Sequence, residues 1–112
     1  MPIACEEYNK VCVMTLSGDF MGEDVAQARK IVEDQIDHRQ IVHFVLDFEK
    51  AAFIDSEGLE ALLWVKRKCE DLFGQVKLAA LDENVKTILE VTRLEHRFQC
   101  HTDITSAVKT MR

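Results

Sequence analysis

A serine between two carboxylates stands at the predicted start of a helix, and it is the residue best placed for regulated chemistry. The segment Asp55-Ser56-Glu57-Gly58 leads into an apolar run with helical spacing, and the first turn of a helix carries free backbone N–H groups. The Ser56 hydroxyl can accept from one of those groups as a helix cap, which is the interpretation that spacing favours. Asp55 can equally be the cap, which would leave the Ser56 hydroxyl in solvent and accessible to a kinase.

Phosphorylation of Ser56 is expected to change binding rather than folding. About two negative charges would be added where the positive end of the helix dipole tolerates them, so the domain should stay folded. The same charges beside Asp55 and Glu57 would repel an acidic partner surface, and a phosphate does not fit a tightly desolvated apolar one. These residues therefore predict a binding switch.

Enzymatic chemistry has less support in the sequence. A serine nucleophile needs a base, but no His is identifiable as a partner for Ser56, and no Gly-rich phosphate loop is present. Asp19, Asp47 and Asp55 could gather at strand ends as a magnesium site, although solvated loop carboxylates are far more common. We therefore expect a protein that binds rather than catalyses, with no cofactor and no metal.

The cysteines do not suggest a metal or redox motif. Cys5, Cys12, Cys69 and Cys100 are widely separated and include no Cys-x-x-Cys pair, which such motifs require. His96, Cys100 and His101 likewise match no standard zinc-ligand spacing. Four free, mostly buried thiols are expected.

Size and charge narrow the choice of partner. The 112 residues suit one domain, residues 1–112, and the formal net charge of -6 repels nucleic acid and anionic membrane surfaces. The basic cluster 66–68 falls on a helical pattern that also carries acidic residues, which indicates a solvated face. No signal peptide is evident at the start and no apolar run approaches the roughly 18 residues of a membrane span. We expect a cytoplasmic protein with no nucleic-acid partner and no direct membrane contact.

Hydrophobic periodicity predicts strands that alternate with helices. Strands are expected at 3–8, 11–17, 41–48, 76–81 and 98–101, the first two forming a hairpin through Asn9-Lys10. Helices are expected over 23–37, from 55 or 56 to the residue before Gly74, over 83–94, and after a Thr102-Asp103 cap. The order ββαβαβαβα predicts a small α/β domain with a mostly parallel sheet, an N-terminal edge hairpin and about four helices. Leu72 and Phe73 are expected on the buried face of the second helix, and Thr92 on the buried face of the third.

The carboxyl ends of the strands should bring two loops together. If the strands at Val11 and Ile41 are parallel, loops 18–22 and 51–58 lie at one end of the sheet, where binding sites of such folds gather. Phe20 and Met21, which follow Gly18-Asp19, are the preferred partner-contact residues together with Leu59, although loop apolar residues often fold inward. Phe53 and Trp64 are expected in the core.

One motif resembles a known family. Residues 53–59 (Phe-Ile-Asp-Ser-Glu-Gly-Leu) follow an apolar strand over 41–47, and the segments 76–78 and 85–89 continue the same element order. This arrangement resembles the STAS domain of anti-sigma-factor antagonists over nearly the whole chain, with Asp-Ser-x-Gly-Leu as its most specific part.

The resemblance implies a phosphorylation cycle. In that family the Ser directly after the Asp, here Ser56, is phosphorylated by a partner that is both a serine kinase and an anti-sigma factor. The unphosphorylated form binds this partner and frees a sigma factor; phosphorylation ends binding, and a phosphatase restores it. The partner-binding surface is expected to comprise Asp19, Phe20, Met21, Asp55, Glu57, Gly58 and Leu59.

The sequence departs from the best-known antagonists at Glu57, where they have a small residue. A carboxylate beside Ser56 can alter kinase recognition. STAS domains also serve as subunits of lipid-transport complexes, as modules of anion transporters and in sensory assemblies, and some are reported to bind nucleotide. A constitutive interaction module in such an assembly is therefore the alternative function.

Overall fold

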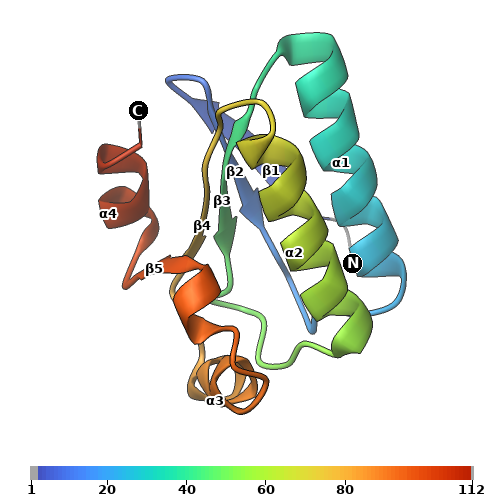
Figure 1. The fold of residues 1–112 in the computed structure, drawn as a ribbon, viewed down its shortest axis with the longest axis vertical. Helices are drawn as coiled ribbons and strands as arrows, with labels where there is room; N and C mark the ends of the chain where they lie inside the picture. Colours follow the sequence, from blue (N-terminus) through green and yellow to red (C-terminus); the bar gives the residue numbers. More distant parts are fainter. Residues whose placement is uncertain (1–2, 112) are drawn as a thin grey trace.

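The computed structural model describes residues 3–111, which form one five-stranded sheet with helices on both faces (Figure 1). The predicted ββαβαβαβα order is confirmed, with one additional short 3-10 turn. The elements are β1 (Ala4–Tyr8), β2 (Val11–Thr15), α1 (Glu23–Arg39), β3 (His43–Asp47), α2 (Ser56–Glu70), β4 (Val76–Ala79), α3 (Glu83–Val91), the 3-10 turn (Glu95–Arg97), β5 (Gln99–His101) and α4 (Ile104–Lys109).

The sheet has the strand order β1-β2-β3-β4-β5 and is parallel except at β1. The β1–β2 hairpin turns at Asn9 and Lys10, which both have positive φ, of 52° and 68°. Two such residues are the requirement of a type I′ turn, whose twist matches that of the flanking strands. The predicted edge hairpin and the central position of β3 are confirmed.

Helices cover both faces of the sheet, and the hydrophobic core is larger on one face than on the other. The main core lies beneath α1 and α2, where Val32, Leu62 and Phe44 are fully buried. On the opposite face a smaller cluster joins Val13 and Val45 of the sheet to Ala107 of α4. Figure 1 shows α1 and α2 together on one side of the strands and α4 alone on the other. Successive residues of a strand point to opposite faces, which is why β2 and β3 are apolar at nearly every position.

The end of α2 differs from the prediction. The helix ends at Glu70, and Leu72 and Phe73 are 46% and 94% exposed rather than buried. Phe73, not Gly74, has the left-handed conformation, with φ of 64°. Gly74 is required for a different reason, because a Cβ there would lie 1.9 Å from the backbone oxygen of Val42.

Helix α3 is shorter than predicted and one of its inward positions is wrong. Val85 and Leu89 are buried as expected, but the helix ends at Val91 and Thr92 is exposed. The Thr92 hydroxyl donates to the Ile88 carbonyl oxygen at 2.7 Å, so it satisfies the helix end instead of packing inside. Within residues 3–111, no helix is both long enough and apolar enough to cross a membrane.

Two of the four thiols lie at the surface, which corrects the expectation of mostly buried cysteines. Cys12 and Cys69 are buried, whereas Cys5 and Cys100 are exposed, and all four are free. Burial raises the pKa of the Cys69 thiol to about 12, as expected for a thiolate that would lose its hydration.

Candidate functional site

The two loops predicted to meet at the carboxyl end of the sheet are joined by backbone contacts. The Phe20 N–H donates to the Phe53 carbonyl oxygen at 2.9 Å, and Phe20 and Ile54 form an isolated parallel bridge. The Leu16 N–H donates to the Asp47 carbonyl oxygen at 3.1 Å. The ladder between β2 and β3 therefore continues beyond the strands, and it holds loop 18–22 against the segment that enters α2.

Asp55, and not Ser56, caps α2. Its backbone is extended, and its Oδ1 accepts from the Gly58 N–H at 2.8 Å. Ser56 is the first residue of the helix, and its side chain is exposed. The interpretation that Ser56 is the cap is thus corrected: because the carboxylate occupies that role, the serine hydroxyl is presented to solvent at the positive end of the helix dipole.

Gly58 allows the first turn of α2 to lie on the neighbouring loop. It is buried, and a Cβ at this position would approach Ile54 Cγ1 and the Phe20 backbone oxygen, each at 2.6 Å. No real Cβ tolerates such contacts, so only glycine fits without movement of the backbone. Gly58 therefore lets the first turn of α2, which includes Ser56, pack closely on loop 18–22. Because it is buried, it is not part of the surface that a partner could contact.

Phe20 and Phe53 exchange the roles that were expected of them. Phe20 is 1% exposed and packs edge to face on Phe48, with ring centroids 6.2 Å apart. Phe53, expected in the core, is 43% exposed. Phe20 thus supports the loop from inside, and Phe53 supplies the aromatic surface beside α2.

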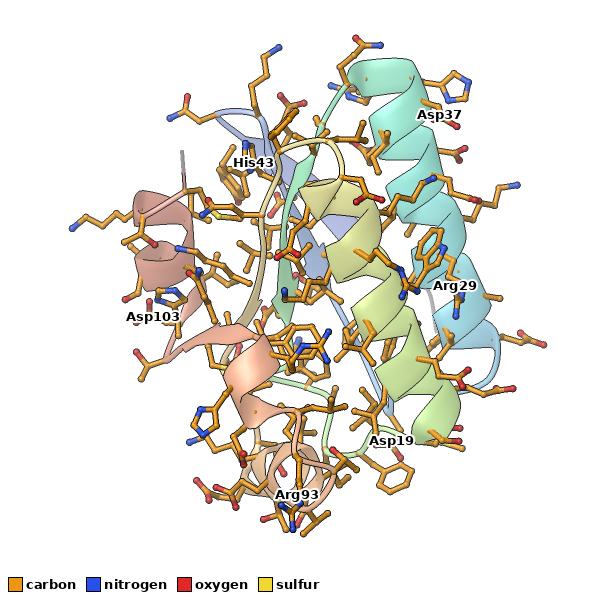
Figure 2. All side chains as sticks on the ribbon, in the orientation of Figure 1. Asp19, Arg29, Asp37, His43, Arg93 and Asp103 are labelled. Carbon is orange, nitrogen blue, oxygen red and sulfur yellow. The ribbon has the colours of Figure 1, made fainter. Side chains whose placement is uncertain are left out.

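The exposed side chains around Ser56 combine apolar and acidic groups. Met21 is 43% exposed, Asp19 and Glu57 are also exposed, and Leu59 is half-buried against the core. Figure 2 shows Asp19 near the end of α2 at which the helix begins. We call Met21, Phe53, Ser56 and Glu57 the α2 surface. It presents two large apolar side chains next to one hydroxyl and one carboxylate.

A shallow groove between α1 and α2 extends this surface. It has a volume of about 240 Å³ and is lined by Gly22, Val25, Ala26, Arg29, Glu57 and Glu60. The Arg29 guanidinium also lies 5.0 Å from the centroid of the Trp64 ring, which is half-buried. Sequence reasoning missed Arg29 and Glu60, although the small residues Gly22 and Ala26, four apart, are the signal that one face of α1 is recessed.

Two of the carboxylates considered for a magnesium site have local structural roles. Asp47 is 4% exposed and accepts from the Glu49 N–H at 3.0 Å, while Asp55 is the α2 cap. Among residues 3–111, no group of three or more His, Cys, Asp or Glu side chains is placed to hold a metal ion. A larger open groove, of about 710 Å³, lies elsewhere, between the β1–β2 turn and α4.

Comparison with known proteins gives consistent results. A family model of the STAS domain matches residues 2–107. A curated relative, the anti-sigma F factor antagonist of Paenibacillus polymyxa, is 24% identical over 94 residues, which are 84% of this chain and 80% of the relative.

Solved structures show the same fold. A candidate anti-sigma factor antagonist from Thermotoga maritima superposes with a TM-score of 0.89 at 18% identity, covering 98% of this chain and 94% of that one. The phosphorylated form of SpoIIAA, described as a Bacillus cell fate determinant, gives 0.79 at 20% identity, covering 99% and 100%. The unphosphorylated form of the anti-sigma factor antagonist SpoIIAA gives 0.82 at 21% identity, covering 96% and 94%. With the family model matching nearly the whole chain, the resemblance carried by Asp-Ser-Glu-Gly-Leu is confirmed, and the protein belongs to the STAS domain family.

Proposed function

We propose that this protein is an anti-sigma-factor antagonist controlled by phosphorylation of Ser56. In its unphosphorylated form it binds an anti-sigma factor that has serine kinase activity, and so releases a sigma factor. Phosphorylation ends binding, and a phosphatase restores it. The observation that carries the proposal lies at the start of α2: Asp55 caps the helix, while Ser56 is exposed. Met21 and Phe53 are exposed on the two loops that the bond from the Phe20 N–H to the Phe53 carbonyl oxygen joins.

In this proposal, phosphorylation of Ser56 leaves the fold unchanged. Because the cap is the Asp55 carboxylate, a phosphate on Ser56 would leave the bond from the Gly58 N–H intact. The charge would sit at the helix N-terminus, where the dipole stabilises it. The domain is therefore expected to keep its structure whether or not Ser56 is phosphorylated. Phosphorylation then changes only the affinity for a partner that contacts the α2 surface.

Binding loss follows from desolvation and charge. Met21 and Phe53 are each 43% exposed, so a partner that covers them removes water from the space next to Ser56. A phosphate with roughly two charges has a large desolvation cost in that space, and Glu57 adds a like charge beside it. In this proposal Ser56 is the substrate of the partner kinase and does no chemistry of its own.

The test is partner binding by variants of Ser56. A serine-kinase anti-sigma factor from the same genome should phosphorylate the wild type at Ser56, which peptide mass spectrometry would locate, and should not phosphorylate Ser56→Ala. Calorimetry should show that Ser56→Ala binds like the wild type and that Ser56→Asp binds at least about tenfold more weakly, a change of ~1.4 kcal/mol.

A matched control separates a local effect from net charge. Thr105 is exposed in the first turn of α4, after the Asp103 cap, on the other face of the sheet. Thr105→Asp adds the same charge at another helix N-terminus and should leave binding unchanged. Equal weakening by Thr105→Asp and Ser56→Asp would refute a switch at Ser56.

The alternative is a constitutive interaction module in a lipid-transport or sensory assembly. Glu57 favours it, because an exposed carboxylate already stands beside Ser56 and a kinase site would have to accommodate it. Under this alternative, partner binding depends on Met21 and Phe53 but is indifferent to Ser56→Ala and Ser56→Asp. The same binding series therefore distinguishes the two functions.

A further inference from the structure

Helices leave part of one face of the sheet open. On that face α4, which has 6 residues, packs mainly on β3, β4 and β5, whereas α1 and α2 cover the opposite face with 17 and 15 residues. A groove of about 710 Å³ lies between α4 and the β1–β2 hairpin. We call it the α4 groove. It is on the face of the sheet away from α1 and α2 (Figure 1).

The α4 groove is apolar on both walls. Tyr8, in the wall that the hairpin forms, is 47% exposed, and its register partner Val11 also lines the groove. The other wall consists of Ile104 and Val108, which are half-buried, together with Met111 just after the helix. One aromatic and two aliphatic side chains thus remain partly in water along the groove, and covering them is favourable.

Opposite charges border the two walls. Glu6 pairs with Val13 in the hairpin, so both side chains point to the face that α4 covers. There the Glu6 carboxylate accepts from the Tyr8 hydroxyl at 2.8 Å. On the other wall Lys109 is exposed and lines the groove. Within residues 3–111, neither Glu6 nor Lys109 forms an ion pair.

The two walls run in the same direction. Helix α4 returns from the carboxyl end of β5, and β1 is antiparallel to its neighbour in an otherwise parallel sheet (Figure 1). A two-fold axis parallel to both, placed between them, therefore exchanges the walls of two copies. Such an axis requires a self-complementary patch. The α4 groove meets this requirement, because it has an apolar centre with Glu6 on one side and Lys109 on the other.

We propose that the α4 groove binds a second copy of this chain, so that α4 of each copy fills the groove of the other. The Tyr8 ring of one copy is then covered by Ile104 and Val108 of the second copy, and Lys109 of each copy pairs with Glu6 of the other at the rim. One contact closes both grooves. The dimer keeps α1 and α2 on its outer sides, so it presents two α2 surfaces to partners.

Pairing of two copies through the edge of the sheet is disfavoured. Glu6 and Glu7 are consecutive on the edge strand β1, so an antiparallel pair of two β1 strands centred on either residue places like charges opposite each other. Charged side chains on an edge strand are a common protection against such pairing. The second copy is therefore expected on the face of the sheet and not at its edge.

The test is sedimentation equilibrium of the full chain at concentrations from about 1 µM to 1 mM, because an interface built on so short a helix is small and its dimer dissociates readily. Glu6→Lys and Lys109→Glu should each weaken the dimer about fivefold or more, since like charges then meet at both rims. The double variant should regain most of the affinity. Glu33→Lys and Lys30→Glu make the same charge changes at exposed positions of α1 and should have no such effect.

Two further variants locate the interface. Tyr8→Ser removes the exposed ring and should weaken the dimer about tenfold or more, while thermal denaturation verifies that the variant is folded. Ser56→Asp, on the other side of the sheet, should leave the dimer unchanged. The proposal is overturned if the wild type stays monomeric over the whole range, if the rim reversals act no more strongly than their α1 controls, or if the double variant regains nothing. Dimerisation that is lost in Ser56→Asp but kept in Tyr8→Ser would place the contact at the α2 surface and also overturn it.

Discussion

The Asp55 carboxylate accepts from the Gly58 N–H at 2.8 Å, and this bond decides what Ser56 is available to do. Both residues are good helix caps, and they stand side by side in the sequence. Because Asp55 takes the cap, Ser56 enters the first turn with an exposed side chain. The stabilising role of the cap and the regulatory role that we propose for Ser56 thus belong to adjacent residues.

The Asp55 cap should be measurable as stability. Asp55→Ala removes the acceptor for the Gly58 N–H and is expected to lower the free energy of unfolding by about 1 kcal/mol, while Asp55→Asn retains most of it. Urea denaturation at pH 7 is the measurement. Asp103→Ala is the control, since Asp103 caps α4 in the same way through the Ser106 N–H at 2.8 Å. No loss in Asp55→Ala would contradict the assignment of the cap.

A negative charge at position 56 should stabilise the fold although it weakens partner binding. Ser56→Asp places a carboxylate in the first turn of α2, where the helix dipole stabilises it by about 0.3–1 kcal/mol. Ser56→Lys, at the same exposed position, should destabilise by a similar amount. Thermal denaturation at low salt measures both variants. If Ser56→Asp unfolds at a clearly lower temperature than Ser56→Lys, weaker partner binding by the Asp variant would reflect damage to the fold rather than a switch.

Glycine is required at two close approaches, and the structure ranks them. Gly58→Ala would place a Cβ 2.6 Å from Ile54 Cγ1 and the Phe20 backbone oxygen, and Gly74→Ala would place one 1.9 Å from the Val42 backbone oxygen. Relief requires backbone movement, so Gly58→Ala should cost about 1–3 kcal/mol and Gly74→Ala more. Urea denaturation compares the two. A stabilised Gly58→Ala protein would mean that α2 does not lie as closely on loop 18–22 as described.

The spacing of apolar residues predicted the helices and strands well, because burying one face of an element requires apolar residues at regular positions. The apolar stripe of α1 matches the spacing of one helix face, and the continuous apolar run of β3 matches a strand that is covered on both faces. The aromatic residues of the site were less predictable. Phe53 and Ile54 are consecutive, and the bridge from Phe20 to Ile54 directs Ile54 inward and leaves Phe53 outside. Adjacent residues of an extended segment alternate faces, but the choice of face depends on a partner loop far away in the sequence.

Competition between neighbouring residues explains two further errors. Asp55 and Ser56 both suit the cap, and only the three-dimensional path of the chain selects between them. At the end of α2, Phe73 rather than Gly74 takes the left-handed conformation. Gly74 is instead the residue at which the chain passes close to the Val42 backbone. A glycine can serve either a conformation or a close approach, and a sequence does not distinguish these two reasons.

Lys77 should make the stability depend on pH. It is 2% exposed beneath α4, where its Nζ donates to the Thr110 hydroxyl, and burial lowers its pKa below that of the unfolded chain. Between the two pKa values the unfolded state binds more protons, so the free energy of unfolding rises with pH across that window. Below the folded-state pKa the ammonium is charged in both states, and its burial destabilises the fold.

The variant Lys77→Met keeps the length of the side chain and removes this charge. It should raise the free energy of unfolding at pH 7, and its advantage over the wild type should shrink as the pH approaches the unfolded value of about 10.4. Urea denaturation at pH 7 and pH 10 measures the difference. Lys109→Met, at an exposed position of α4, changes the net charge equally and corrects for it. An advantage that is the same at both pH values would show that the Lys77 ammonium is not the origin of the effect.

Phe20 and Phe53 should separate folding from binding most clearly, because one is buried and the other exposed. Phe20→Ala empties a core site and is expected to cost about 3–5 kcal/mol of stability. Phe53→Ala removes a side chain that is 43% exposed and should leave the unfolding transition nearly unchanged while weakening partner binding by about tenfold or more. Calorimetry with the proposed anti-sigma-factor partner, together with thermal denaturation of each variant, makes the comparison. If Phe53→Ala binds like the wild type, the partner does not cover the α2 surface.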